Sequence, residues 1–140
     1  MADPRNARGI IDTSLVIDLE HVEPGDLPAE LAVSAVTLAE LAAGPHATTD
    51  PQERARRQDR LQRAEATFEP LPVDANVARA YGRIYAAVAG AGREARGARS
   101  LDLLIAATAL ASNLPLYTRN PHDFRGTGDL IEIVVLEPAS

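Results

Sequence analysis

The sequence predicts a single α/β domain, in which a mainly parallel sheet carries helices on both faces in a three-layer α/β/α arrangement. Short apolar runs alternate along the chain with longer segments of helical periodicity, as in βαβ units. The length of 140 residues corresponds to one domain covering 1–140. A hydrophobic content of 46% is enough for one core. We expect about four to five strands in the sheet.

The chain begins with a strand followed directly by a helix. Residues 9–12 form a short apolar strand that ends at Asp12. A helix follows over 13–18, with Asp12 or Thr13 as its N-cap. A polar loop rich in proline and glycine leads to the next element.

A second strand–helix unit comes next. Residues 31–36 form its strand, and its helix begins at Thr37 and ends at the Gly44-Pro45 pair. After a loop, the charged segment 50–67 forms a helix with only a thin apolar stripe.

The second half of the chain is predicted to contain two helices. A proline-interrupted, strand-like piece covers 69–73, and Asp74 caps the helix that follows. That helix has one apolar face and ends at Gly90 and Gly92. Ser100 caps a largely apolar helix that runs to Ser112 and should be buried.

Two strands complete the predicted sheet. Residues 114–118 form one strand and 129–136 the other, with an Asn120-Pro121 turn between them. We expect flexible tails at 1–8 and 137–140.

The composition excludes several kinds of chemistry. The chain has no cysteine, which rules out disulfides, zinc–thiolate sites and a cysteine nucleophile. All 14 basic residues are arginine, so a P-loop and Schiff-base catalysis are excluded as well. The N-terminus lacks an apolar signal core, and no apolar run approaches the roughly 20 residues of a membrane span. We therefore expect a soluble, cytoplasmic protein without a membrane partner.

The net charge of −6 argues against broad, nonspecific binding of nucleic acid. A local basic patch is still compatible with it. Arg93, Arg96 and Arg99 lie within a short glycine-containing segment just before Asp102. They could bind phosphates through bidentate contacts, or they could belong to a merely solvated loop.

Acidic residues stand where the predicted elements meet. Asp12 ends a strand, Asp123 closely follows another, and Glu40 and Asp102 lie near helix starts. In open α/β sheets, ligands bind beyond the carboxyl ends of the strands. Carboxylates that converge there repel one another unless a cation such as Mg²⁺ or Mn²⁺ is bound. Such a metal activates water and stabilises phosphoryl charge, so the pattern favours phosphodiester hydrolysis.

Each acid also has a structural explanation. Asp12 could simply cap the first helix. Glu40 could complete a capping box with Thr37. Asp102 could complement the helix dipole in the first turn after Ser100.

Five stretches, in this order along the chain, resemble the PIN-domain ribonucleases, and specifically the VapC-type toxins of toxin–antitoxin pairs. They are 10–14 (IIDTS), 36–41 (VTLAEL), 71–74 (LPVD), 100–109 (SLDLLIAATA) and 116–124 (LYTRNPHDF). The resemblance implies a PIN-like fold and Mg²⁺-dependent endonucleolytic cleavage of RNA, with Mn²⁺ as the alternative ion.

The resemblance also assigns roles to individual residues. Asp12 and Asp102 would be direct metal ligands, and Glu40 would bind the metal directly or through water. The expected catalytic set is Asp12, Glu40, Asp102 and Asp123; the expected supporting residues are Thr13, Ser14, Thr118 and Asn120; and the expected RNA-binding residues are Arg93, Arg96, Arg99 and Arg119.

One position departs from the family pattern. Many PIN domains have an acid directly after the Thr-Arg pair of the last motif, where this chain has Asn120. An amide holds water but brings no charge, so a second metal is in doubt. Asp123 could substitute for the missing acid, or it could cap the Asn120-Pro121 turn.

The resemblance further implies a homodimer, an RNA substrate and a small cognate antitoxin whose tail covers the active-site groove. Two alternatives stay open. The domain could be a catalytically weak or inactive module that binds RNA or protein. It could also be a metallohydrolase directed at DNA or at phosphomonoesters, since metal-activated water attacks any phosphoester.

Overall fold

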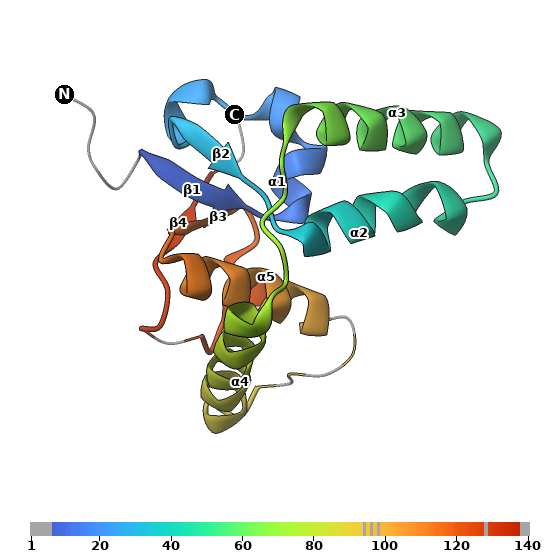
Figure 1. Ribbon diagram of the computed structural model, residues 1–140. Coiled ribbons are helices and arrows are strands. Elements are labelled where there is room, and N and C mark those ends of the chain that lie inside the picture. The colour runs from blue at the N-terminus through green and yellow to red at the C-terminus, as the bar shows by residue number, and fades with distance from the viewer. Residues whose placement is uncertain (1–6, 94, 96, 98, 128, 138–140) are drawn as a thin grey trace.

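The computed structural model describes residues 7–137 apart from 94, 96, 98 and 128 (Figure 1). Its strands are β1 (Arg8–Ile11), β2 (Glu30–Ala32), β3 (Leu116–Thr118) and β4 (Ile133–Val135). Its helices are α1 (Thr13–Ile17), α2 (Ala35–Ala43), α3 (Pro51–Thr67), α4 (Ala75–Gly90) and α5 (Arg99–Ser112). Short 3-10 helices occupy Leu19–His21, Pro24–Asp26, Gly44–Ala47 and Pro121–Phe124.

The four strands form one parallel sheet in the order β2-β1-β3-β4. Ile10 of β1 pairs with Ala32 on one side and with Leu116 on the other. Parallel neighbours need crossover connections, and the helices supply them. The predicted three-layer α/β/α class with a parallel sheet is therefore confirmed.

The central strands are buried on both faces, with alternate residues pointing to opposite sides. Ile10 and Leu116 belong to one core cluster, whereas Ile11 and Tyr117 belong to the other. Gly9 makes room for the ring of Tyr117, because a Cβ at Gly9 would lie 2.5 Å from Tyr117 Cε1. The chain therefore packs one core on each face of the sheet.

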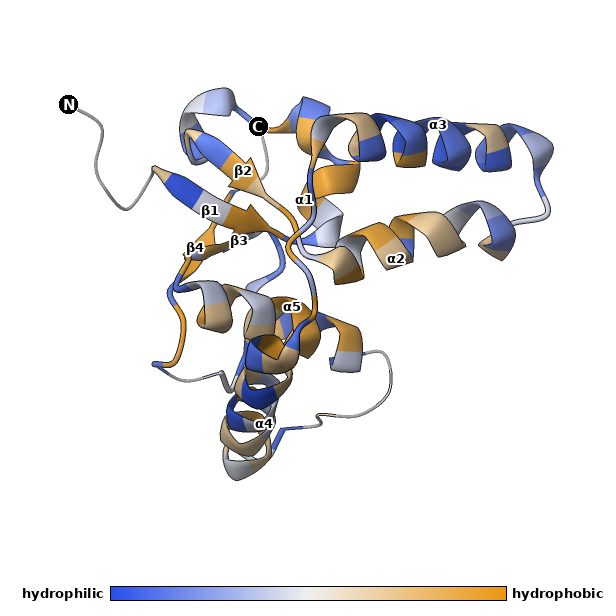
Figure 2. Ribbon diagram, viewed as in Figure 1, coloured by the Kyte–Doolittle hydropathy of each residue, from blue (hydrophilic) through white to orange (hydrophobic). Residues whose placement is uncertain are grey.

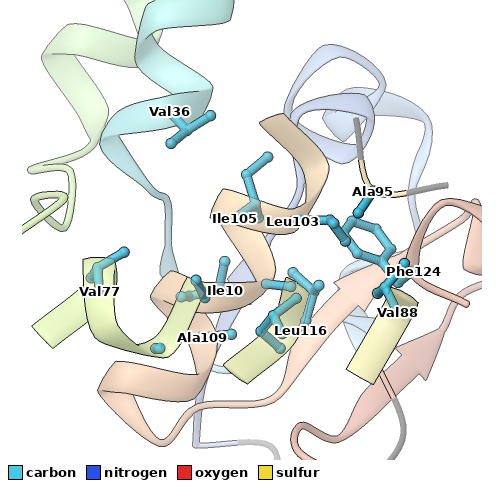
Figure 3. Close-up of a cluster of buried hydrophobic side chains, with 14 of the residues drawn as sticks. Ile10, Val36, Val77, Val88, Ala95, Leu103, Ile105, Ala109, Leu116 and Phe124 are labelled. Carbon is cyan, nitrogen blue, oxygen red and sulfur yellow. The ribbon is translucent and has the colours of Figure 1, made fainter. Parts of the chain in front are cut away.

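Helices α4 and α5 cover the first face and pack against each other (Figure 1). Figure 3 shows this core, to which Val77 and Val88 of α4 and Leu103 and Ile105 of α5 belong. Phe124 closes the cluster beside Val88. The apolar helix predicted to be central is thus buried against both the sheet and α4.

Helices α1, α2 and α3 cover the other face, where α2 and α3 lie side by side and project beyond the sheet (Figure 1). Only the sheet-facing residues of this layer are buried, among them Leu15, Leu41 and Ala64. Figure 2 shows that α3 is hydrophilic along most of its length. This agrees with the thin apolar stripe predicted for 50–67.

The strand predicted at 31–36 is wrong in its second half, and so is the helix start at Thr37. Strand β2 stops at Ala32, and Ser34 already caps α2 by accepting a hydrogen bond from the N–H of Val36. A buried serine with a local acceptor favours a helix start over continued extension.

Other boundaries also differ from the expected ones. The expected cap Ser100 lies inside α5, which begins at Arg99. The piece at 69–73 makes only an isolated bridge between Leu71 and Ser34. Strand β1 begins at Arg8, inside the expected N-terminal tail. Among the described residues, no helix is long and apolar enough to cross a membrane.

Candidate active site

The direction of the strands brings four acidic residues to one edge of the sheet. Asp12 follows the carboxyl end of β1, and Asp123 follows that of β3. Helix α2 leaves β2 at this edge, which places Glu40 in its second turn there. Helix α5 precedes β3 and runs against the strands, so its first turn, with Asp102, begins at the same edge.

Asp12 is 4% exposed, and both of its carboxylate oxygens are occupied. Oδ1 accepts from the N–H of Leu15 at 3.0 Å and caps α1. Oδ2 accepts from the hydroxyl of Thr118 at 2.6 Å. Burial raises the pKa of Asp12, these two hydrogen bonds lower it, and the charges of Asp123 and Glu40 raise it further. The predicted N-cap is confirmed.

Thr118 links Asp12 to the loop after β3. Its fully buried hydroxyl also accepts from the backbone N–H of Asn120 at 2.9 Å. The side-chain amide of Asn120 donates to Ser14 Oγ at 3.3 Å. Asn120, which stands where the resemblance leads us to expect a fourth acid, is therefore tied to the first turn of α1. Three of the four expected supporting residues surround Asp12 in this way.

Glu40 is held by Thr13 of α1 rather than by a capping box. The hydroxyl of Thr13 donates to Glu40 Oε1 at 2.7 Å and lies 3.0 Å from Thr37 Oγ1. Thr13 is the donor in both contacts and has one hydroxyl proton, so that proton is shared between Glu40 and Thr37, and the contact to the carboxylate is the shorter. The predicted Thr37–Glu40 capping box is wrong, because α2 begins at Ala35. The side chain of Glu40 therefore does not cap α2.

Asp102 is half-buried near the other acids. Burial, followed by the charges of Asp123, Glu40 and Asp12, raises its pKa to about 6, although Arg99 acts to lower it. Asp123 therefore interacts electrostatically with Asp102. The structure places the other three sequence-predicted acids close enough to Asp102 for their charges to affect its pKa.

The donor set has the chemistry of a hard-cation site. Within the described ranges, no three acidic or histidine side chains stand close enough to hold one ion between them. Charge repulsion acts over longer distances than metal coordination. The carboxylates can therefore raise one another's pKa without lying close enough for three of them to bind one ion. Mg²⁺ usually binds through one or two carboxylates and several waters. The four carboxylates fit such an ion, although not a three-carboxylate cage.

The arginines expected to bind RNA have different surroundings. Arg99 opens α5 and donates to the carbonyl of His122 at 3.5 Å. Arg93 packs against Gly126. Arg119 pairs with Asp18 at 3.4 Å, and its side chain is only 21% exposed. Arg96 lies outside the described residues.

Two residue groups near the acids have no counterpart in the sequence-based prediction. Thr37 contacts Thr13, which binds Glu40, and this contact exists only because α1 packs on α2. Arg57 and Arg60 of α3 border a cavity of about 370 Å³ that also touches Thr13 and Glu40. The sequence shows these two arginines three residues apart on a polar helix, but that spacing is typical of any solvated helix face and does not indicate a site.

Comparison with known proteins agrees with this geometry. The family model described as "PIN domain" matches residues 10–130. The chain is 37% identical over 117 residues to Ribonuclease VapC5 of Mycobacterium tuberculosis, which covers 81% of this chain and 84% of that protein. It is also 37% identical over 102 residues to Ribonuclease VapC8 of the same species, covering 72% of this chain and 89% of that protein.

A solved structure is similar over almost the whole chain. It is the crystal structure of VapBC-5 from Mycobacterium tuberculosis, a member of the VapBC family of toxin–antitoxin systems. The TM-score is 0.79 at 34% sequence identity, with 93% of this chain and 99% of that chain covered.

Proposed function

Because the chain belongs to the PIN domain family, we propose that it is a Mg²⁺-dependent endoribonuclease that acts as a toxin on cellular RNA. The observation that carries the proposal is the group of four carboxylates at one sheet edge, two of which have raised pKa values in the absence of a cation. A site of this kind is costly for the fold unless a cation is bound during function.

Asp12 and Asp102 are the proposed metal ligands. Asp12 is rigid, because Thr118 and the N-terminus of α1 hold both of its oxygens. Asp102 is half-buried, and the negative charges of the other three acids raise its pKa. Glu40 orients a water or binds the ion directly, and Thr13 fixes its carboxylate. Asp123 contributes the remaining negative charge.

The chain supplies positioning and electrostatics for the reaction. A bound Mg²⁺ would provide an activated water and would stabilise the charge that develops on phosphorus. Thr13 binds only one oxygen of the Glu40 carboxylate, so the other oxygen can accept the proton of the attacking water. Asn120 and Ser14 offer uncharged polar contacts beside Asp12, in keeping with a single ion.

The proposed partners follow from the relatives. The similar solved structure is of a toxin–antitoxin system, which supports a small cognate antitoxin of the VapB type for this chain. We further propose a homodimer. RNA is the proposed substrate, and the enzyme would act in the cytoplasm, where cellular RNA is found.

Cleavage of RNA by the purified chain, freed of any antitoxin, tests the function. Wild-type protein with Mg²⁺ should cut cellular RNA, and a chelator should stop it. Asp102→Asn should lower the rate by at least about a hundredfold, because it removes a ligand charge while keeping the shape. The exposed Asp26, in the 3-10 helix Pro24–Asp26, offers the matched control Asp26→Asn, which should keep full activity.

The alternatives give distinct outcomes in the same assay. Wild-type protein that binds RNA but stays inert with Mg²⁺ and Mn²⁺ is a binding module. Cleavage of single-stranded DNA in preference to RNA would contradict the RNA assignment, since the 2′-hydroxyl distinguishes the two substrates.

A further inference from the structure

Two cavities lie along the junction of α1 and α3. One, of about 370 Å³, extends from Thr13 and Glu40 to Arg57 and Arg60. The other, of about 340 Å³, continues between α1 and the second half of α3. Both are bordered by Ile17 and Arg60. We call the two together the α1–α3 crevice; it leads away from the acid group.

Most charges that border the crevice are already paired. Arg57 donates to Glu53 Oε2 at 3.0 Å and to the carbonyl of Gly44 at 2.9 Å. Hydrogen bonds from Arg56 and Arg57 hold the pKa of Glu53 below its usual value, so this carboxylate stays ionised. Arg63 pairs with Asp59 at 2.8 Å. These groups neutralise one another.

Arg60 is different, because it borders both cavities and is only partly exposed. It makes no hydrogen bond or ion pair with any part of the chain that the structure describes. A guanidinium carries five donors in a planar fork that suits a phosphate. Arg60 is partly exposed, so water solvates its charge in the free protein, and none of its donors is used by the described residues. Arg60 is therefore available to bind an anion in the crevice.

We propose that the RNA strand flanking the scissile phosphodiester runs through the α1–α3 crevice and that Arg60 binds one of its backbone phosphates. This rests on the proposed function. The scissile phosphate has to reach the acids around Glu40, so the adjoining nucleotides must leave through a neighbouring channel, and this crevice begins at Glu40. Ile17, which is 40% exposed between the two cavities, offers apolar contact to a ribose or base.

The test compares Arg60→Gln with Arg56→Gln, each in the Asp102→Asn protein so that RNA is bound without being cut. Both changes remove one charge from α3 at similar helix propensity. Arg56 lies outside both cavities, with a side chain that is 61% exposed and paired with Glu53. The probe is a short, fluorescently labelled, mixed-sequence single-stranded RNA, whose anisotropy is measured at increasing salt.

Arg60→Gln should raise the Kd about tenfold, the effect of one lost charge-assisted contact. It should also reduce the slope of log K against log salt by about 0.7, the value for one phosphate on a single strand. A merely structural role of Arg60 would leave that slope unchanged. Arg56→Gln should keep both the affinity and the slope.

Equal affinities and slopes for the two variants, or no RNA binding at all, would overturn the assignment. Loss of affinity for an acidic antitoxin segment in Arg60→Gln, with RNA binding intact, would assign the crevice to a protein partner instead. If wild-type protein fails to cleave RNA while Arg60→Gln still shows the predicted loss of binding, the proposed function is wrong and the phosphate site stands.

Discussion

Asp12 combines two roles that look like alternatives at the level of the residue. Its first oxygen caps α1 through Leu15, and its second accepts from Thr118. Capping and site formation therefore do not compete, because a carboxylate has enough lone pairs for both and for a cation. An acid that ends a strand before a helix is held rigidly where a ligand can reach it.

Glu40 shows the opposite relation between local pattern and role. The Thr-x-x-Glu spacing matches a capping box, yet Ser34 is the cap and Glu40 bonds to Thr13 from another helix. Ser34, three residues before Thr37, is buried and hydrogen-bonded as the N-cap, so the helix begins there and the capping box does not form. The local explanation for Glu40 is thereby removed, which strengthens the case for its role in the site.

The raised pKa of Asp102 predicts how stability depends on pH in metal-free protein. Its folded-state pKa of about 6 exceeds the usual 3.8, so the folded state holds a proton that the unfolded state releases between these values. The resulting stability is present near pH 4 and is lost as the pH rises through about 6. Asp102→Asn cannot ionise, so its thermal midpoint should exceed that of wild type above this window, with the difference shrinking towards pH 4.

Thermal melts in the presence of a chelator measure this difference. Asp26→Asn, which changes an exposed acid in the 3-10 helix Pro24–Asp26, should have the same melting temperature as wild type at every pH in this range. Parallel melting-temperature curves for wild type and Asp102→Asn across the window would contradict the burial and repulsion described for Asp102.

At the level of elements, one chain of hydrogen bonds joins the two helices that carry Glu40 and Asp102. Ser34 accepts from the N–H of Val36 and lies 3.1 Å from the hydroxyl of Thr108, which donates to the carbonyl of Leu104. Since the proton of Thr108 is already used, Ser34 donates to Thr108. The start of α2 is thus fixed to the middle of α5.

Ser34→Ala should lower the free energy of unfolding by about 1–3 kcal/mol. The change leaves the buried N–H of Val36 without its acceptor and removes the hydrogen bond between Ser34 and Thr108, and water cannot replace the lost oxygen where Ser34 is fully buried. Urea denaturation followed by circular dichroism measures the loss.

Asp50→Ala is the matched comparison for that cap. Asp50 caps α3 through the N–H of Gln52 at 3.2 Å, but it does so in solvent. Water can replace the missing carboxylate there, so the loss should be at most about 1 kcal/mol. Equal losses for the two caps would mean that burial of Ser34 does not matter.

For the whole molecule, a cation should act as a stabilising ligand. The carboxylates come from the junction of β1 and α1, from α2, from α5 and from the 3-10 helix after β3, so the proposed ion binds only the folded chain. Binding at about 100 times the Kd stabilises by about 2.7 kcal/mol. Mg²⁺ should therefore raise the thermal midpoint of wild type, and the shift should vanish in Asp102→Asn.

Asp26→Asn provides the control for this shift, which it should retain in full. If the Mg²⁺ shift survives in both Asp102→Asn and Asp12→Asn, the ion binds elsewhere on the chain. This experiment needs no RNA, so it separates metal binding from catalysis.

The sequence by itself determined the α/β class, the parallel sheet and the acids at the strand–helix junctions. These follow from alternation, apolar runs and turn residues, which are local properties. The end of β2, the start of α2 and the partner of Glu40 were decided only by tertiary packing. Ser34 caps α2 while it is hydrogen-bonded to Thr108 of the distant helix α5. Thr13 reaches Glu40 only when α1 packs on α2. Arg60 likewise became a candidate RNA contact only when α3 was placed beside α1, because contacts between distant segments leave no trace in local spacing.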